Sequence, residues 1–225
     1  MALPQHPQDP QAPHDPVPPE APASGDPEAH ARRMAKLKAV VDRRIAAAQE
    51  EKGLLMVHTG ARKGKTTAAM GMLVRSLGHG FPCAVVQFIK GPQPTAEQLL
   101  TRLAELTGAR LQWDRCGEGF TWNTQDQARD AARAREGWAL VRTRLADPEL
   151  RFLLLDELNL VLARGWLDPE AVVRELQARP RDLHVVITGR GAPDRLLAAA
   201  DLVTEMREVK HPFRAGIKAQ AGIEF

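Results

Sequence analysis

A short apolar segment that passes directly into a turn rich in glycine and lysine is the feature that most restricts the fold of this chain. Residues 54–58, Leu-Leu-Met-Val-His, have the character of a buried strand, and residues 66–77 have the spacing of a helix. Between them lies Thr-Gly-Ala-Arg-Lys-Gly-Lys-Thr-Thr, residues 59–67. A strand, a glycine-containing turn and a helix start form an anion site, because backbone N–H groups and the positive end of the helix dipole converge there.

The residue types in this loop suit the phosphate groups of a nucleotide. Small residues let backbone N–H groups turn toward an anion, Lys65 supplies a compact positive charge, and the Thr66 hydroxyl can ligate Mg²⁺. A lysine-rich surface turn would explain the composition, but not the strand before it or the helix after it. We therefore predict that the nucleotide is bound by Gly60, Ala61, Arg62, Lys63, Gly64, Lys65, Thr66 and Thr67.

A second motif combines an apolar strand with two carboxylates. Residues 152–155 are Phe-Leu-Leu-Leu, and Asp156 and Glu157 follow. Ligands of α/β sheets bind at the carboxyl ends of the strands, which places both carboxylates beside the phosphate loop. One of them can hold Mg²⁺ or its water shell, and the other can be a general base if the reaction moves a proton. Together the two motifs predict Mg²⁺-nucleotide binding and leave the reaction open.

The rest of the chain alternates between apolar strands and helices. Further strands are expected at residues 84–89, 111–113, 185–188 and 202–206, and helices at residues 95–106, at 123–146 with Asn123 as N-cap, and after the N-cap Asp168. Apolar strands that alternate with helices are typical of a parallel sheet covered on both sides. The predicted fold class is therefore α/β, with a mainly parallel central sheet and helices on both faces.

The beginning of the chain differs in composition from the rest. Residues 1–27 contain 9 of the 17 prolines, four acidic residues and no Lys or Arg, so they are expected to be a disordered or extended acidic tail. Residues 28–52 carry apolar side chains at helical spacing and are expected to form an amphipathic N-terminal helix. The nucleotide-binding domain would then comprise residues 53–225.

Composition excludes several classes of protein. The two cysteines cannot form a disulfide scaffold, there is no apolar run of about 18 residues to span a membrane, and the first residues do not resemble a signal peptide. We therefore expect a cytoplasmic protein without a membrane partner. The net charge is +3, and without the tail's four acidic charges it is +7, which suits a polyanionic ligand.

Seven segments, in the order in which they occur, resemble one family over roughly residues 30–225. They are VVDRRIAAAQEEKG, HTGARKGKTTAAMG, VVQFIKG, GEGFTWNTQD, LLLDELN, VVITGRGAP and VKHPFRAGIKAQAGIEF. The family is that of the P-loop-type corrinoid adenosyltransferases, which act on cob(I)alamin or cob(I)yrinic acid a,c-diamide. The resemblance implies a RecA-like P-loop fold and a homodimer.

The resemblance also implies a reaction. Co(I) of the reduced corrinoid attacks C5′ of ATP and triphosphate leaves, in the biosynthesis or salvage of adenosylcobalamin. The protein then supplies positioning and electrostatics, with Lys65 and Mg²⁺ opposing the charge of the leaving triphosphate. Thr66 and Glu157 are the implied Mg²⁺ residues. A flavoprotein reductase is the expected electron donor.

Three further catalytic candidates lie outside the loop. Phe120 and Trp122 match the family's corrin-facing segment, where large rings can keep water and the lower axial base away from cobalt; ordinary core aromatics are the alternative. Arg190 follows the strand at residues 185–188, lies at the same sheet edge and can pair with phosphate, although a surface arginine in a turn is equally consistent.

The loop departs from the family's usual G-[ND]-G-K-G-K-T-T at two positions. Ala61 and Arg62 replace the polar residue and the middle glycine, so Arg62 would be strained if that position needs a positive φ angle. Arg62 can either add a charge for phosphate or obstruct nucleotide entry, and the sequence leaves both open.

Three other functions remain open. The chain could be another P-loop ATPase or kinase, which would release ADP or AMP, or a nucleotide-dependent corrinoid-binding protein with weakened catalysis. A RecA-like nucleic-acid module is disfavoured, because no array of basic and aromatic residues is spaced for stacking with bases.

Overall fold

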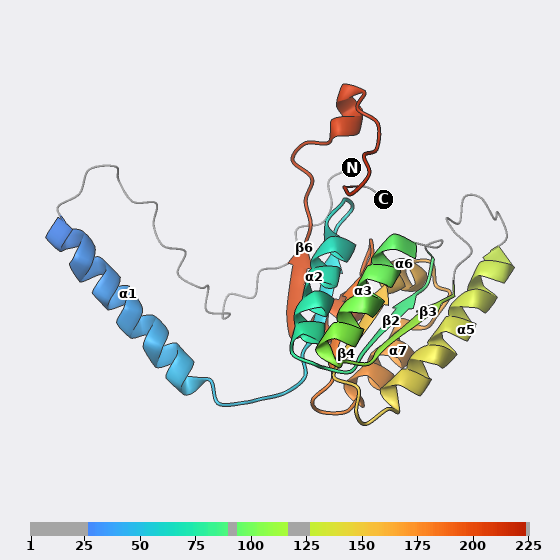
Figure 1. The fold of residues 1–225 in the computed structure, drawn as a ribbon, viewed down its shortest axis with the longest axis horizontal. Coiled ribbons are helices and arrows are strands. Elements are labelled where there is room, and N and C mark those ends of the chain that lie inside the picture. Colours follow the sequence, from blue (N-terminus) through green and yellow to red (C-terminus); the bar gives the residue numbers. More distant parts are fainter. Residues whose placement is uncertain (1–26, 90–93, 117–126, 224–225) are drawn as a thin grey trace. The chain divides into compact units, whose positions relative to one another are not determined.

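The computed structural model describes residues 27–89, 94–116 and 127–223, and it contains two compact units, Met1–Glu50 and Glu51–Phe225 (Figure 1). In the first unit, helix α1 spans Pro27–Ala47. It ends at Ala47 rather than at residue 52 as the sequence pattern predicts. The Gln49 side chain donates to the Ala46 carbonyl at 3.3 Å, and in the second unit the Gly53 N–H donates to the Arg181 carbonyl at 2.6 Å. The Gly53 N–H is therefore bonded to a distant segment of the chain and does not continue the helix.

The second unit is built on a six-stranded sheet in the order β3-β2-β4-β5-β1-β6. Every pairing in it is parallel. The predicted mainly parallel α/β fold is therefore confirmed. The strands are β1 Leu55–Thr59, β2 Cys83–Gln87, β3 Leu111–Arg115, β4 Phe152–Asp156, β5 His184–Thr188 and β6 Leu202–Glu205.

Helices cover both faces of this sheet because alternate strand residues point to opposite sides (Figure 1). Helices α2 (Lys65–Gly78) and α3 (Pro94–Thr107) pack on one face, where Met56, Val85 and Leu154 join their apolar cluster. The other face is covered by α5 (Gln127–Leu145), α6 (Leu158–Ala163), α7 (Pro169–Gln177) and α8 (Asp194–Ala199). The four middle strands are buried on both faces, which explains their continuous apolar sequences.

Most element boundaries agree with the predictions to within one or two residues. Asp168 is the N-cap of α7 as predicted, and its carboxylate accepts from the Glu170 and Ala171 N–H groups at 3.1 and 3.2 Å. Strand β2 ends at Gln87, short of the predicted residue 89, and Phe88 and Ile89 are buried beyond the strand. Asn123, the predicted N-cap of the helix that begins at Gln127, lies outside the described residues.

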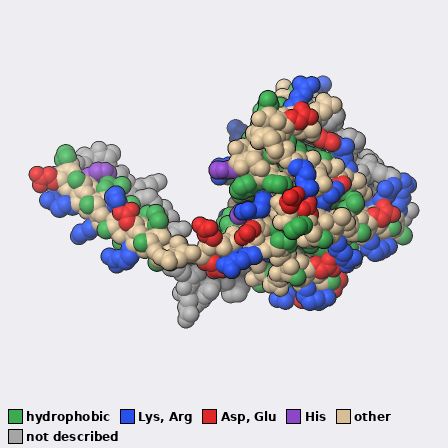
Figure 2. Space-filling model, turned by 60° about the horizontal axis from the view of Figure 1, so that its bottom comes forward, with side chains coloured by type: hydrophobic (Ala, Val, Ile, Leu, Met, Phe, Trp, Pro, Cys, Tyr) green, Lys and Arg blue, Asp and Glu red, His purple; other side chains and the backbone are tan. Residues whose placement is uncertain are grey.

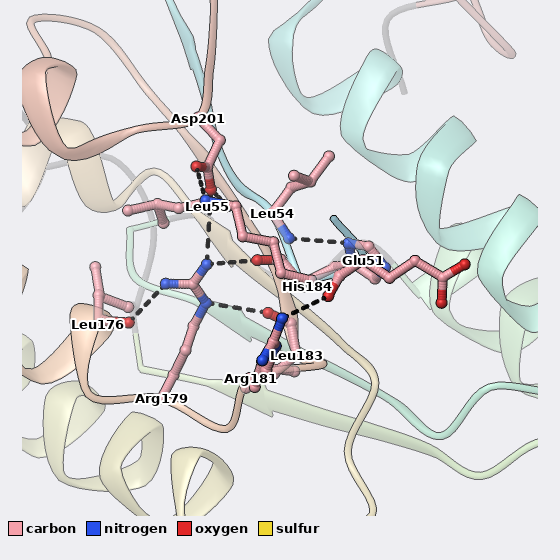
Figure 3. A network of polar contacts seen from close by, with 11 residues as sticks. Glu51, Leu54, Leu55, Leu176, Arg179, Arg181, Leu183, His184 and Asp201 are labelled. Carbon is pink, nitrogen blue, oxygen red and sulfur yellow. Dashed lines mark hydrogen bonds and ion pairs between the residues drawn. The ribbon is translucent and has the colours of Figure 1, made fainter. Parts of the chain in front are cut away.

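The segment that leads into β1 is fixed to the edge at which the strands begin (Figure 3). The Arg179 guanidinium donates at 2.8, 2.9 and 3.0 Å to the backbone carbonyls of Gly53, Leu176 and Leu183. The Asp201 carboxylate accepts from the Leu55 N–H at 2.8 Å and pairs with Lys52 at 2.7 Å. Burial acts to raise the pKa of Asp201, but these partners outweigh it and hold the pKa below its ordinary value.

His184 belongs to the same network. Its Nδ1 atom accepts a hydrogen bond from the Leu54 N–H at 3.1 Å. Burial lowers the pKa of His184, the charges of Arg151 and Arg179 lower it further, and Asp182 opposes them. The folded protein therefore favours the neutral imidazole, which is also the form that can accept from Leu54.

We expect the free energy of unfolding to decrease as the pH falls below about 6.5, the ordinary histidine pKa. In that range the unfolded chain binds a proton at His184 that the folded chain does not, with a slope of up to about 1.4 kcal/mol per pH unit. His184→Asn keeps an acceptor for Leu54 but cannot titrate. Urea unfolding between pH 8 and 5 should show a weaker pH dependence in this variant, and identical slopes would contradict the assignment.

Candidate active site

Two glycines shape the loop between β1 and α2. Gly60 has a φ angle of 106° and Gly64 one of 108°, values that side chains rarely allow. A Cβ atom on Gly60 would also lie 2.4 Å from the Met206 carbonyl oxygen, so this position excludes any side chain. Gly64 directly precedes the first residue of α2. The loop thus enters the helix N-terminus along a path that glycine makes possible, as the phosphate-loop prediction requires.

Lys65 is buried at the start of α2, with 6% of its surface exposed. Its ammonium group donates to the Gly60 carbonyl at 2.9 Å and also to the Arg62 carbonyl. His58, at the end of β1, is buried, and its Nδ1 lies 3.3 Å from the Lys65 carbonyl oxygen, in agreement with a structural role. The Lys65 charge therefore lies inside the curve of the loop, where an anion would meet the loop N–H groups.

Arg62 replaces a glycine of the family's usual loop, but it does not have the strained, positive φ angle that this replacement could require. Among the described residues, Glu157 is the one non-glycine residue with a positive φ angle. The loop therefore accommodates Ala61 and Arg62 in ordinary backbone conformations, and both residues, like Lys63, are exposed. Replacement of the middle glycine changes the charge of the loop and does not require an unusual backbone.

The Asp156 carboxylate lies at the centre of the polar contacts at the end of the sheet. It is fully buried, and it accepts from the Thr66 hydroxyl at 2.9 Å and the Thr188 hydroxyl at 2.6 Å. Its second oxygen accepts from the Gln87 side-chain N–H group at 3.1 Å, and the side-chain oxygen of Gln87, Oε1, accepts from the Trp113 indole N–H at 3.0 Å. The loop on β1 is thus joined to the ends of β2, β4 and β5.

Glu157 is the N-cap of α6 and has a left-handed backbone, with a φ angle of 64°. Its N–H donates to the Thr188 hydroxyl at 3.1 Å, while that hydroxyl donates to Asp156. A left-handed non-glycine residue costs about 1–3 kcal/mol and is common at functional sites. The structure therefore brings both acidic residues to the end of β4, with Asp156 buried against Thr66 and Glu157 half-buried.

Asn159 is a buried residue of α6 that connects two strand ends. Its amide donates to the carbonyls of His58 and Gly189, each at 3.1 Å. Gly189 has a φ angle of 132°, and a Cβ atom there would lie 3.0 Å from the Asn159 Cβ. Arg190 follows with an exposed side chain, on the turn after β5. The structure thus places Arg190 at the predicted sheet edge.

The two aromatic candidates, Phe120 and Trp122, lie outside the described residues. Cys116 is the last described residue before them, and it is buried; a Cβ atom on Gly137 of α5 would be 2.9 Å from its sulfur. Burial raises the pKa of the Cys116 thiol to about 11 and that of Cys83 to about 12, and for Cys116 the charges of Asp114 and Glu136 add to the rise. Neither cysteine supplies a thiolate nucleophile near neutral pH.

Sequence reasoning did not identify Gln87, Thr188 and Asn159 as parts of the site. Gln87 and Thr188 end apolar strands, and a polar residue at a strand's carboxyl end is the signal that could have found them.

No helix in the described part of the chain is long and apolar enough to cross a membrane. Residues 27–89, 94–116 and 127–223 also contain no cluster of three His, Cys, Asp or Glu side chains that could hold a metal.

The parallel sheet, the two left-handed glycines and the buried lysine at the start of α2 define a P-loop-like α/β protein. Residues 51–225 match the family described as "ATP:corrinoid adenosyltransferase BtuR/CobO/CobP", and residues 21–45 match the family "Cob(I)alamin adenosyltransferase N terminal". The chain therefore belongs to the ATP:corrinoid adenosyltransferase family, which is a family of transferases, and the resemblance seen in the sequence is confirmed.

Individual relatives agree with this assignment over nearly their whole length. A corrinoid adenosyltransferase of Pseudomonas aeruginosa is 50% identical over 196 residues, which are 87% of this chain and 95% of the relative. One from Sinorhizobium sp. is 49% identical over 206 residues, 91% of this chain and 95% of the relative. One from Escherichia coli K12 is 46% identical over 198 residues, 88% of this chain and 98% of the relative.

Proposed function

We propose that this chain transfers the 5′-deoxyadenosyl group of ATP to Co(I) of a corrinoid and releases triphosphate. The proposal rests on family membership over residues 51–225 and, in the structure, on one observation: the Thr66 hydroxyl, at the N-terminus of α2, lies 2.9 Å from the buried Asp156 carboxylate. This contact joins the two motifs that the chemistry needs, a loop for the phosphates and an acid for their metal ion.

The reaction requires little acid–base chemistry from the protein. The Co(I) electron pair forms the bond to C5′, the bond from C5′ to the triphosphate oxygen breaks, and its electron pair leaves with triphosphate. The chain contributes by orienting ATP and by opposing the charge that grows on the leaving group. Lys65 and the loop N–H groups are suited to this task, and Arg190 can approach the same group from the turn after β5.

Mg²⁺ fits the residues at this place. Mg²⁺ prefers oxygen ligands and usually keeps several waters, with one or two protein ligands plus substrate phosphates. Thr66 supplies a hydroxyl oxygen and Asp156 and Glu157 supply carboxylates, so a set of three acidic or histidine ligands is not needed. We propose that Thr66 holds the ion directly, with Glu157 acting on it or on its water shell and Asp156 orienting Thr66. The bound ion would neutralise charge on the triphosphate.

Phe120 and Trp122 are proposed to face the corrin ring and to exclude the lower axial ligand of cobalt. Loss of that ligand makes Co(II) easier to reduce. Phe120→Ala and Trp122→Ala should therefore slow the reaction that starts from cob(II)alamin at least about tenfold more than the reaction that starts from pre-reduced cob(I)alamin. Rates are measured anaerobically from the corrinoid spectrum. Equal losses with both substrates would contradict this role.

One assay tests the proposed function. Protein, ATP, Mg²⁺ and cob(I)alamin are mixed under reducing, anaerobic conditions, and the corrinoid spectrum is followed together with the phosphate products. A light-sensitive Co–C product and stoichiometric triphosphate are expected. Release of ADP or AMP would indicate another ATPase or kinase. Tight corrinoid binding without a Co–C product would indicate a nucleotide-dependent binding protein, and either result would overturn the proposal.

A nucleic-acid function is not favoured by the surface. On the face shown in Figure 2, Lys and Arg side chains are interspersed with Asp and Glu. Binding to a polyanionic backbone would instead favour a continuous basic stripe.

The family resemblance further supports a homodimer in the cytoplasm that receives electrons from a flavoprotein reductase. The dimer is tested by measuring the molar mass of the full chain in solution.

A further inference from the structure

The segment after β6 lies beside the phosphate loop. The Met206 N–H donates to the Thr59 carbonyl at 2.9 Å, and the Met206 carbonyl lies where a side chain on Gly60 would be. The Met206 sulfur would be 3.5 Å from a Cβ atom on Gly64. Met206 therefore lies directly against the loop, and the charged residue Glu208 follows two residues later.

Glu208 places a shielded carboxylate in this position. Only 7% of its side chain is exposed, and neither carboxylate oxygen has a hydrogen-bond partner in the part of the chain that the structure describes. Instead it lies between two guanidinium groups, with Arg214 at 3.0 Å and Arg62 at 3.9 Å. Burial of a carboxylate without hydrogen bonds is unfavourable unless charge compensates it, so the two arginines are its counter-ions.

The pair with Arg62 is the weaker of the two. Its distance, from the Arg62 Nε atom to a carboxylate oxygen, is at the outer limit for an ion pair, and 52% of the Arg62 side chain is exposed. Ion pairs with an exposed partner contribute little to stability. Arg62 is thus held near Glu208 by charge alone and can be released at small cost.

We propose that Arg62 is a ligand of the nucleotide's triphosphate and that it exchanges Glu208 for phosphate oxygens when the nucleotide binds. A triphosphate carries several negative charges, and a guanidinium group can donate two parallel hydrogen bonds to phosphate, which the pair with Glu208 does not provide. Glu208 keeps Arg214 after the exchange and is not left without a counter-ion. Arg62 therefore adds charge for phosphate, and Glu208 competes with the nucleotide for that charge.

This inference rests on the proposed function for the identity of the nucleotide, but its test needs no corrinoid. Binding of ATP and of inorganic tripolyphosphate is measured by calorimetry for the full chain and for Arg62→Ala, Glu208→Gln and the double variant. Arg62→Ala should weaken binding about tenfold, and Glu208→Gln should tighten it about threefold to tenfold. In the double variant, loss of Glu208 should have almost no effect, because nothing remains for it to compete for.

Glu205→Gln is the matched control. It removes the same charge from the exposed carboxyl end of β6, three residues before Glu208. It should tighten binding less than Glu208→Gln, and by the same factor with or without Arg62. If Glu208→Gln is poorly folded in thermal unfolding, Glu208→Asp, which retracts the carboxylate from Arg62, should tighten binding in the same Arg62-dependent way.

Three results would overturn the exchange. Unchanged or tighter binding by Arg62→Ala would make Arg62 neutral or an obstruction. Tightening by Glu208→Gln that persists without Arg62 would reduce Glu208 to a general field effect. Weaker binding by Glu208→Gln would mean that Glu208 positions Arg62 for phosphate. Failure of adenosyl transfer with the expected binding pattern would overturn only the proposed function.

Discussion

Lys65→Ala is expected to abolish adenosyl transfer, with a loss of at least about 10³-fold in kcat/KM. Lys65 is buried at the start of α2, and its ammonium group lies inside the loop, bonded to the Gly60 carbonyl at 2.9 Å. Its removal takes away a shielded positive charge that the proposed function places opposite the leaving triphosphate, and it also releases the loop carbonyls that the side chain holds. Rates with cob(I)alamin and ATP measure the effect.

Lys63→Ala is the matched control for this prediction. Lys63 is two residues away in the same loop and is exposed, so its removal changes the net charge equally. We expect a loss of no more than about tenfold, because an exposed charge is screened by solvent. Comparable losses in both variants, with folded protein, would show that net loop charge matters and that the buried position of Lys65 does not.

The fold could be predicted because its strands carry an unusually clear pattern. Phe152–Asp156 and Cys83–Gln87 are buried on both faces, which makes them continuous apolar runs that a parallel sheet between helices explains. The end of α1 could not be predicted in the same way. The apolar spacing near Ile45 continues the helical pattern, whereas the helix stops at Ala47, before the backbone at Gly53 bonds to Arg181.

The parts of the candidate site that could be predicted are those whose residues are neighbours in the sequence. The parts that depend on the order of the strands in the sheet could not be predicted. The loop and the acidic strand end are local patterns. That Thr188 and Gln87 converge on Asp156 depends on β4 lying between β2 and β5, and a sequence orders its strands along the chain without showing their order in the sheet. Glu208 was missed for the same reason, because its contact with Arg62 joins distant segments.

Asp156→Asn is expected to destabilise the protein by about 2–4 kcal/mol and to weaken Mg²⁺-dependent ATP binding. The fully buried carboxylate accepts from Thr66, Thr188 and Gln87. Thr66 and Thr188 donate to one carboxylate oxygen, which an asparagine would keep, but the N–H group that replaces the other oxygen would face the N–H group of the Gln87 side chain. Gln87 cannot turn its oxygen toward the amide without losing the Trp113 indole, which donates to that oxygen at 3.0 Å. At least one buried donor is then left without an acceptor.

Glu157→Gln separates the structural role of the two carboxylates from their proposed role at Mg²⁺. Glu157 is the next residue, is half-buried and uses its backbone N–H to bind Thr188, so its side chain should matter less for folding. Urea unfolding of Glu157→Gln should show that the free energy of unfolding falls by no more than about 1 kcal/mol. ATP binding by this variant should nevertheless require a higher Mg²⁺ concentration than ATP binding by the unmodified chain. If Asp156→Asn unfolds at the same urea concentration as the unmodified chain, the Asp156 carboxylate does not stabilise this end of the sheet. Binding of Mg²⁺ would then be the remaining explanation for the two carboxylates at the end of β4.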